Sequence, residues 1–424
     1  MEENLKRVLR TPEVLFIGIN GVIGGGIFLL PGQVASFAGD KSLWAYLLAG
    51  VIAILIGLAF AEASSMFTKT GGSVVYAEKA MGKTVAFTVG WMGWLTFVIG
   101  WASLSNGLVS YLTALIPGVK PYKDLIIIVL VGSLCLLNSF GVRKGSWTIM
   151  FFSIAKLIPL ALLIIVGLFV VSHMQSFAGH LGSVKNFGKA VLVLIFAYGG
   201  FEMATIPQGE MVNPRKSVAI GVLGTLVGVT LFYMLIQVAA QRLDPALATS
   251  TAPLADAGKA MFVGGATVMT IGAALSIFGT KSGVALSSPR ILYALSYNRS
   301  LPEAFSKVWP RFQTPVVAIW TTGILVIILA STGTFQHLIL LNVAARLYEY
   351  LMVCISVLIL RFSEKEAERP FKLPFGITIP VIAAALCIWL LCQEAGNQLL
   401  AALVALIVGL VLYAVSRVTQ HNAA

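Results

Sequence analysis

The sequence predicts an all-α polytopic membrane protein, and its composition and its apolar runs carry that prediction. Of the 424 residues, 58% are hydrophobic and only 11% are charged, and the mean hydropathy is +0.92. A soluble domain carries roughly 25% charged residues. Apolar runs long enough to cross a bilayer, which takes about 20 helical residues, recur along the whole chain and are separated by short loops with Pro, Gly and charge.

On this length criterion the sequence predicts twelve transmembrane helices. Their approximate bounds are residues 12–37, 42–66, 84–116, 125–140, 147–172, 187–211, 218–241, 261–294, 315–331, 335–360, 377–393 and 399–415. The four cysteines fall inside apolar runs and the four histidines share no ligand spacing. We therefore expect no disulfide, no metal site and no cofactor.

The placement of the basic residues predicts the orientation of these helices. If the N-terminus is cytoplasmic, 19 of the 29 Lys and Arg residues fall on the cytoplasmic side, 7 fall outside and three fall within spans. An excess of Lys and Arg in cytoplasmic loops is typical of membrane proteins. We expect a multi-pass protein of the cell membrane with both termini cytoplasmic, in which the net charge of +12 reflects orientation and not nucleic-acid binding.

Two of the predicted spans are interrupted by glycine, at residues 24–26 in the first and at 199–200 in the sixth. Glycine costs about 1 kcal/mol relative to alanine in a helix interior, and lipid cannot satisfy freed backbone groups. Interruptions five spans apart indicate an inverted five-plus-five repeat with the substrate between the two broken helices. Half-helix N-termini favour an anion and unwound carbonyls a cation. A zwitterion fits such a site, which points to an amino acid carrier.

Five stretches, in order, resemble motifs of the amino acid–polyamine–organocation (APC) transporters. Residues 21–28 are similar to the first-span signature, with Gly25 in place of a serine, and residues 196–200 with 210–214 are similar to the sixth span of the L-type branch. The other three are residues 70–76 with Gly82, residues 288–290 with Leu301 and Pro302, and Arg361 with residues 369–374.

The resemblance, which covers residues 11–380, implies a LeuT-type fold that works by alternating access. Residues 1–172 would form the first repeat, residues 173–361 the second, inverted repeat, and residues 362–424 two peripheral helices with a short tail. The N–H groups that would hold the substrate carboxylate are those of Gly24, Gly25 and Gly26. The carbonyls that would hold the α-ammonium lie around Phe196, Ala197 and Gly199, with Phe196 as an aromatic gate. The apolar and aromatic candidates for the walls are Ile23, Phe196, Phe201 and Tyr348.

Six ionisable residues interrupt the apolar spans, and each costs about 2.5–3.5 kcal/mol unless it is paired or hydrated. They are Glu62, Lys156, Glu202, Lys281, Arg346 and Glu349. The resemblance implies that Lys156 occupies the place of a sodium ion in sodium-coupled relatives and bridges spans 1, 5 and 8. With Glu202 it is a candidate coupling residue, and whether it carries a proton is open. For Glu202 we also expect a structural hydrogen-bonding role.

Lys281 departs from the family pattern, which has a neutral residue at this place. It could meet an acidic substrate side chain, pair with Glu202 or face an aqueous vestibule, and it argues against a polyamine substrate. Glu62 lies toward the cytoplasmic end of its span, where we expect it to make a gate or loop contact. Arg346 and Glu349 lie three residues apart on one helix face and are expected to neutralise each other.

The sequence therefore predicts a sodium-independent secondary transporter of amino acids, proton-coupled or exchanging, that works as a monomer in lipid. The alternatives are a carrier of another small organic ion, such as an amine or an organic acid, and a channel. An enzyme would show clustered His, Asp or Cys, which this sequence lacks. The apolar walls favour a neutral amino acid and Lys281 favours an acidic one, so the substrate and the direction of transport are left open.

Overall fold

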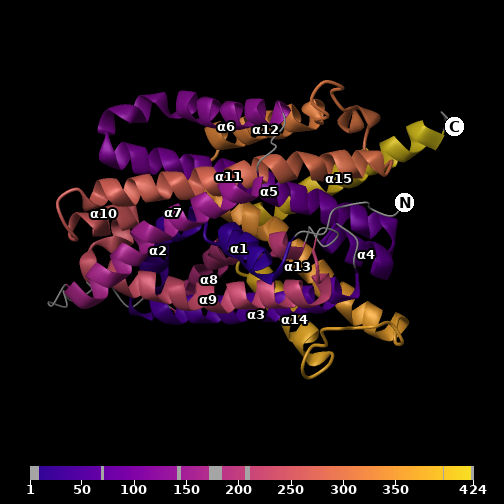
Figure 1. Cartoon of the computed structure of the whole chain (residues 1–424), viewed down its shortest axis with the longest axis horizontal. Helices are drawn as coiled ribbons and strands as arrows, with labels where there is room; N and C mark the ends of the chain where they lie inside the picture. Colours follow the sequence, from indigo (N-terminus) through magenta and orange to yellow (C-terminus); the bar gives the residue numbers. More distant parts are fainter. Residues whose placement is uncertain are drawn as a thin grey trace.

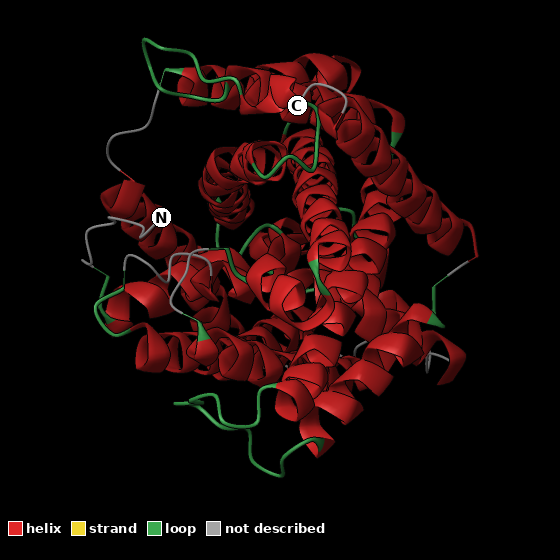
Figure 2. Ribbon diagram, turned by 90° about the vertical axis from the view of Figure 1, so that its right-hand side faces the viewer, coloured by secondary structure: helices red, strands yellow, loops and turns green. Residues whose placement is uncertain are grey.

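The computed structural model describes residues 9–67, 71–140, 145–170, 184–205, 211–394 and 396–421. Within these ranges the regular elements are all helices, and Figure 2 shows no strand among them. Eight helical segments are long and apolar enough to cross a membrane, and three shorter apolar helices accompany them. The all-α membrane prediction is confirmed, while the count of twelve spans stays a prediction.

Each predicted span corresponds to one helix or to two. The helices before residue 171 are α1 (Thr11–Val22), α2 (Gly26–Ala38), α3 (Ser42–Met66), α4 (Ser73–Met81), α5 (Lys83–Leu115), α6 (Lys123–Ser139) and α7 (Gly145–Ile165). The later helices are α8 (Val184–Tyr198), α9 (Pro214–Leu243), α10 (Pro253–Lys259), α11 (Gly265–Tyr297), α12 (Val316–Thr332), α13 (Phe335–Ser363), α14 (Thr378–Leu391) and α15 (Gly396–His421).

Three differences from the sequence-based bounds have local causes. The first predicted span is divided into α1 and α2, and the sixth into α8 and a short 3₁₀ helix, Phe201–Thr205. The eighth begins later than predicted because Gly264, with a left-handed φ of 92°, caps the start of α11. The short helices α4 and α10 lie in predicted loops. The predicted ends of the fifth span, at 171–172, and of the sixth, at 206–210, fall outside the described residues.

Helices that are far apart in sequence pack side by side. Figure 1 shows α6 and α12 along one side of the molecule and α3, α9 and α14 along the opposite side, with α1 and α8 between them. Helix α3 packs along α9, α5 along α13, and α7 against α11. Every described residue of α8 from Ala190 to Tyr198 is buried. The two interrupted segments therefore lie in the interior of the molecule.

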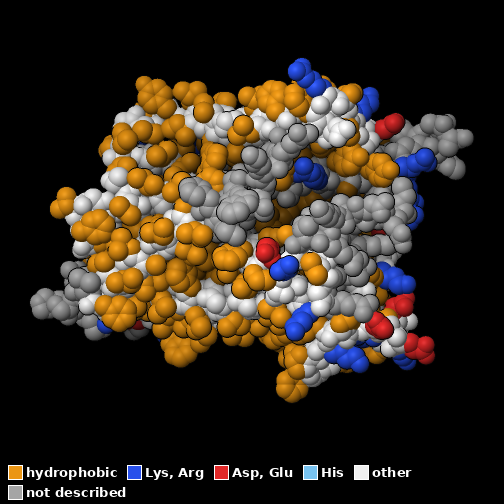
Figure 3. Space-filling view, in the orientation of Figure 1, with side chains coloured by type: hydrophobic (Ala, Val, Ile, Leu, Met, Phe, Trp, Pro, Cys, Tyr) orange, Lys and Arg blue, Asp and Glu red, His pale blue; other side chains and the backbone are white. Residues whose placement is uncertain are grey.

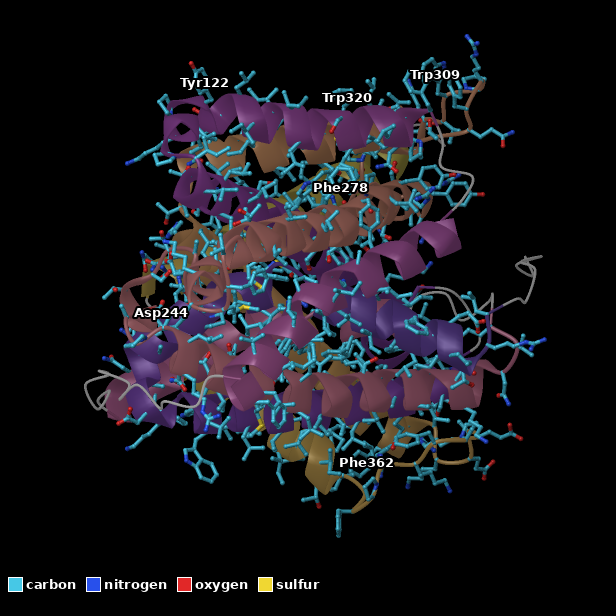
Figure 4. All side chains as sticks on the ribbon, turned by 60° about the vertical axis from the view of Figure 1, so that its left-hand side comes forward. Tyr122, Asp244, Phe278, Trp309, Trp320 and Phe362 are labelled. Carbon is cyan, nitrogen blue, oxygen red and sulfur yellow. The ribbon has the colours of Figure 1, made fainter. Side chains whose placement is uncertain are left out.

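The surface and the loops agree with a protein that crosses a membrane. Apolar side chains cover most of the face in Figure 3, and the visible charged side chains gather mainly toward the right-hand end. Figure 4 places Tyr122 and Asp244, from two loops predicted to lie outside, at one end of the molecule. Trp309, from a loop predicted to lie inside, is at the other end.

Glu62 joins the end of α3 to the end of α13 and to the loop between α13 and α14. Its side chain is buried and accepts hydrogen bonds from both Nε (2.7 Å) and NH2 of Arg361. It also accepts one from the backbone N–H of Leu373 at 2.8 Å, and Nε of Arg369 lies 3.7 Å away. The expected contact between Glu62 and this loop is confirmed.

We expect Glu62→Ala to lower the free energy of unfolding by about 3–5 kcal/mol, because it leaves the Arg361 guanidinium without its buried partner. The control is Glu364→Ala, which removes the exposed Lys79–Glu364 pair of 2.7 Å. That change should cost at most about 1 kcal/mol. Thermal and denaturant unfolding in detergent measure both variants, and equal effects would contradict the prediction.

Candidate functional site

The first helix interruption leaves backbone donors free at the start of α2. Helix α1 ends with the N–H of Ile23 bound to the carbonyl of Ile19 at 2.9 Å, and the N–H of Gly24 is bound to the carbonyl of Val22 at 2.8 Å. No side chain caps α2, and the N–H groups of Gly25 and Gly26 have no acceptor among the described residues. A helix N-terminus of this kind attracts an anion.

The second interruption touches the first through bare backbone. Helix α8 ends at Tyr198, and Gly200 has a φ of 116°, a conformation that favours glycine. A Cβ atom on Gly200 would overlap the carbonyl of Gly21 in α1, and one on Gly21 would overlap the carbonyl of Gly200. The chain therefore needs glycine at both positions for α1 to approach the end of α8.

A cavity lies where the two interruptions meet. Its volume is about 50 Å³, which is enough for several water molecules. Six residues predicted for the substrate site line it: Gly24, Gly26, Phe196, Ala197, Gly199 and Lys281. Lining residues that the sequence did not place there include Thr96, Gly100, Met203, Thr280 and Arg346.

The other four predicted substrate residues are not among the described residues that line the cavity, although Gly25 caps the start of α2 between two lining residues, Gly24 and Gly26. Ile23 is buried in the apolar core. Gly25 packs so closely on α11 that a Cβ there would lie 2.5 Å from Ile277. Phe201 packs edge-on against Phe60, with 5.4 Å between ring centroids. The Tyr348 hydroxyl is hydrogen-bonded to that of Thr88 at 2.7 Å.

Lys156 joins α7 to the end of α1. Its side chain is fully buried, and Nζ donates to the carbonyl oxygen of Asn20 at 2.9 Å and to Asn20 Oδ1 at 2.6 Å. Asn20 is one of the residues that sequence reasoning missed, although a lone amide within an apolar helix is a visible signal. The Lys156 ammonium is thus fixed to the last turn of α1, just before the helix interruption.

Glu202 holds the second interruption together. Its carboxylate accepts from the N–H of Gly200 at 2.8 Å, from Nη1 of Arg346 at 2.7 Å and from the Tyr350 hydroxyl at 3.0 Å. The guanidinium lies over Gly199, where any Cβ atom would overlap it. These contacts agree with the structural hydrogen-bonding role expected for Glu202.

The predicted pairing of Arg346 with Glu349 is wrong. Among the described residues, Glu202 is the one whose carboxylate lies within ion-pair distance of Arg346, and Glu349 instead accepts a hydrogen bond from Ser73 at 2.7 Å. The helix interruption brings Glu202 to the Arg346 face of α13, while Glu349 points toward α4. Among the described residues no ion pair joins Lys281 to Glu202, whose oxygens accept from Gly200, Arg346 and Tyr350.

These observations define a multi-pass membrane protein with a buried, partly charged cavity between two interrupted helices. The sequence profile of the amino acid permease family matches residues 9–414, and the chain belongs to that family. The resemblance to the APC transporters is thereby confirmed. The family and the relatives below are transporters and not enzymes.

Curated relatives cover nearly the whole chain. The serine/threonine exchanger SteT of Bacillus subtilis is 31% identical over 91% of this chain and 90% of its own length. The methylthioribose transporter of the same species is 27% identical, over 97% of this chain and 93% of its own. The branched-chain amino acid permease BcaP, also from this species, is 25% identical over 97% of this chain and 93% of its own length. Relatives that are amino acid permeases and exchangers support amino acid transport.

Proposed function

We propose that the protein is a sodium-independent secondary transporter that carries an amino acid across the cell membrane by alternating access. The observation that supports this most is the cavity at the contact of the two helix interruptions, with free N–H groups on one side and helix-end carbonyls on the other. Transport is coupled to protons or proceeds by exchange with a second amino acid.

In this proposal the two interruptions bind the two ends of the zwitterion. The α-carboxylate accepts from the N–H groups of Gly25 and Gly26 at the positive end of α2. The α-ammonium donates to carbonyls at the end of α8, around Phe196, Ala197 and Gly199. The Ala197 carbonyl already accepts from the Tyr233 hydroxyl at 3.2 Å, and its second lone pair is free to accept from the α-ammonium.

The overall organisation that we propose has ten core spans and two peripheral ones. Residues 1–172 and 173–361 form the two inverted repeats, and residues 362–424 form the peripheral pair and the tail, with both termini cytoplasmic. Lys156 takes the place of a coupling sodium ion, because its ammonium already bonds to Asn20 beside the interruption. Glu202 is the second coupling candidate through its bond to the Gly200 backbone.

Uptake by proteoliposomes tests the proposal. We expect purified protein to take up at least one radiolabelled amino acid at a rate that does not change when sodium is replaced by choline. An inward pH gradient or internal amino acid should accelerate uptake, which separates symport from exchange. Strict sodium dependence would contradict the role given to Lys156. Uptake of an amine, an organic acid or methylthioribose without uptake of any amino acid would favour the alternative carrier function.

A further inference from the structure

Lys281 brings a charge to the cavity that no described acidic side chain neutralises. It lies in α11, is 5% exposed and lines the cavity. It forms no hydrogen bond or ion pair with any residue that the structure describes. Two other buried acids of the apolar spans have different partners, since Glu202 pairs with Arg346 and Glu349 accepts a hydrogen bond from Ser73. A lysine at such a depth costs about 2.5–3.5 kcal/mol unless it is paired or hydrated.

Other buried polar atoms near Lys281 also have no hydrogen-bond partner within the described ranges. They are Oγ1 of Thr280, Oδ1 of Asn342 and Nε of Arg346. Nδ2 of Asn342 and Nζ of Lys281 both lie against Gly100, at 2.9 and 3.8 Å from the position of a Cβ there. An unsatisfied buried polar group costs about 1–3 kcal/mol. Thr280 and Arg346 line the cavity, and unsatisfied polar atoms in its wall point to a polar ligand.

The residue before Lys281 lies close to the free helix end. Oγ1 of Thr280, the residue before Lys281, is 3.5 Å from the position of a Cβ on Gly24. Gly24, Thr280 and Lys281 all line the same cavity. A single small ligand can therefore reach the N-terminus of α2 with one anionic group and Lys281 with another.

We propose that the substrate is an acidic amino acid, whose side-chain carboxylate pairs with Lys281 while its α-carboxylate binds the start of α2. The inference rests on the proposed function and names the substrate class of that same site. A carboxylate fits because it brings one negative charge and accepts hydrogen bonds without donating any. The Lys281 ammonium offers three donors and the Thr280 hydroxyl one more.

The test compares acids with their isosteric amides. We expect purified wild-type protein at pH 7 to bind L-glutamate or L-aspartate about tenfold or more tightly than L-glutamine or L-asparagine, measured by calorimetry and by competition for uptake. Lys281→Met should weaken binding of the acid by about tenfold or more and leave binding of the amide nearly unchanged. Lys281→Arg, which keeps the charge, should keep the preference for the acid.

The matched control is Lys189→Met, which removes an exposed lysine from α8 and should leave the acid-to-amide ratio unchanged. If Lys281→Met does not fold, Lys281→Gln and the wild-type ratio provide the same comparison. Equal affinity of the wild type for acid and amide, or an equal loss for both in Lys281→Met, would overturn the inference. Uptake of neutral amino acids would then leave the proposed function standing, whereas failure to bind any amino acid would overturn both.

Discussion

Gly200→Ala is expected to abolish uptake and to lower the free energy of unfolding by about 2–5 kcal/mol. Two effects add at this position. Gly200 has a φ of 116°, and a Cβ atom would overlap the Gly21 carbonyl, which belongs to backbone and cannot rotate away. The variant must separate α1 from the end of α8 and so distort the cavity that both interruptions line. Uptake by proteoliposomes and thermal unfolding in detergent measure the two effects.

The control for this variant is Gly228→Ala in α9. Gly228 is exposed, lies within a regular helix and has no heavy atom within 4 Å of a Cβ placed on it. Alanine is the better helix former by about 1 kcal/mol, so this variant should be at least as stable as the wild type and fully active. A Gly200→Ala protein with wild-type uptake would show that the contact between the interruptions is not needed for transport.

Lys156→Met is expected to reduce uptake by about 100-fold, since loss of one partner of a buried charged contact costs about 2–5 kcal/mol. The ammonium makes two bonds to Asn20, immediately before the first interruption. The variant should still fold, with a free energy of unfolding lower by about 1–3 kcal/mol, because the carbonyl and Oδ1 of Asn20 lose a buried donor. Uptake in proteoliposomes, with thermal unfolding in parallel, measures both.

The matched control is Lys83→Met, which removes an exposed lysine at the start of α5. It should change neither uptake nor stability. Asn20→Ala removes Oδ1 but keeps the backbone carbonyl. Its rate of uptake should lie between those of Lys156→Met and the wild type. Wild-type uptake in Lys156→Met would remove this lysine from the transport mechanism.

The sequence was most informative where the signal is local. Apolar length predicted the long helices, and the glycines at 24–26 and 199–200 predicted where two of them are interrupted, because glycine in an apolar helix is unfavourable and visible without any other part of the chain. The amphipathic helices α4 and α10 were not predicted because their apolar faces are too short to stand out among loops.

The site was harder to predict because it depends on contacts between distant segments. Arg346 and Glu349 look like a pair along one helix, yet the turn at Gly199 brings Glu202 to Arg346 from 144 residues away. Ile23 and Phe201 are adjacent in sequence to lining residues, and Tyr348 is two residues from Arg346, but the direction of each side chain is set by its helix and its neighbours. The sequence identified Lys281 as a candidate site residue, because a charge in an apolar run is a local signal. That no described acidic side chain pairs with it could be learned only from the fold.

The contact between Gly21 and Gly200 has a mechanical consequence. Because no side chain lies between them, the backbones of the two residues are in direct contact. A displacement of one must therefore move the other. A tilt of α1 would therefore shift the turn that carries the N–H bound by Glu202 and, through that carboxylate, the Arg346 guanidinium on α13. A change in cavity occupancy that tilts α1 would therefore also move α13, through the backbone contact at Gly200.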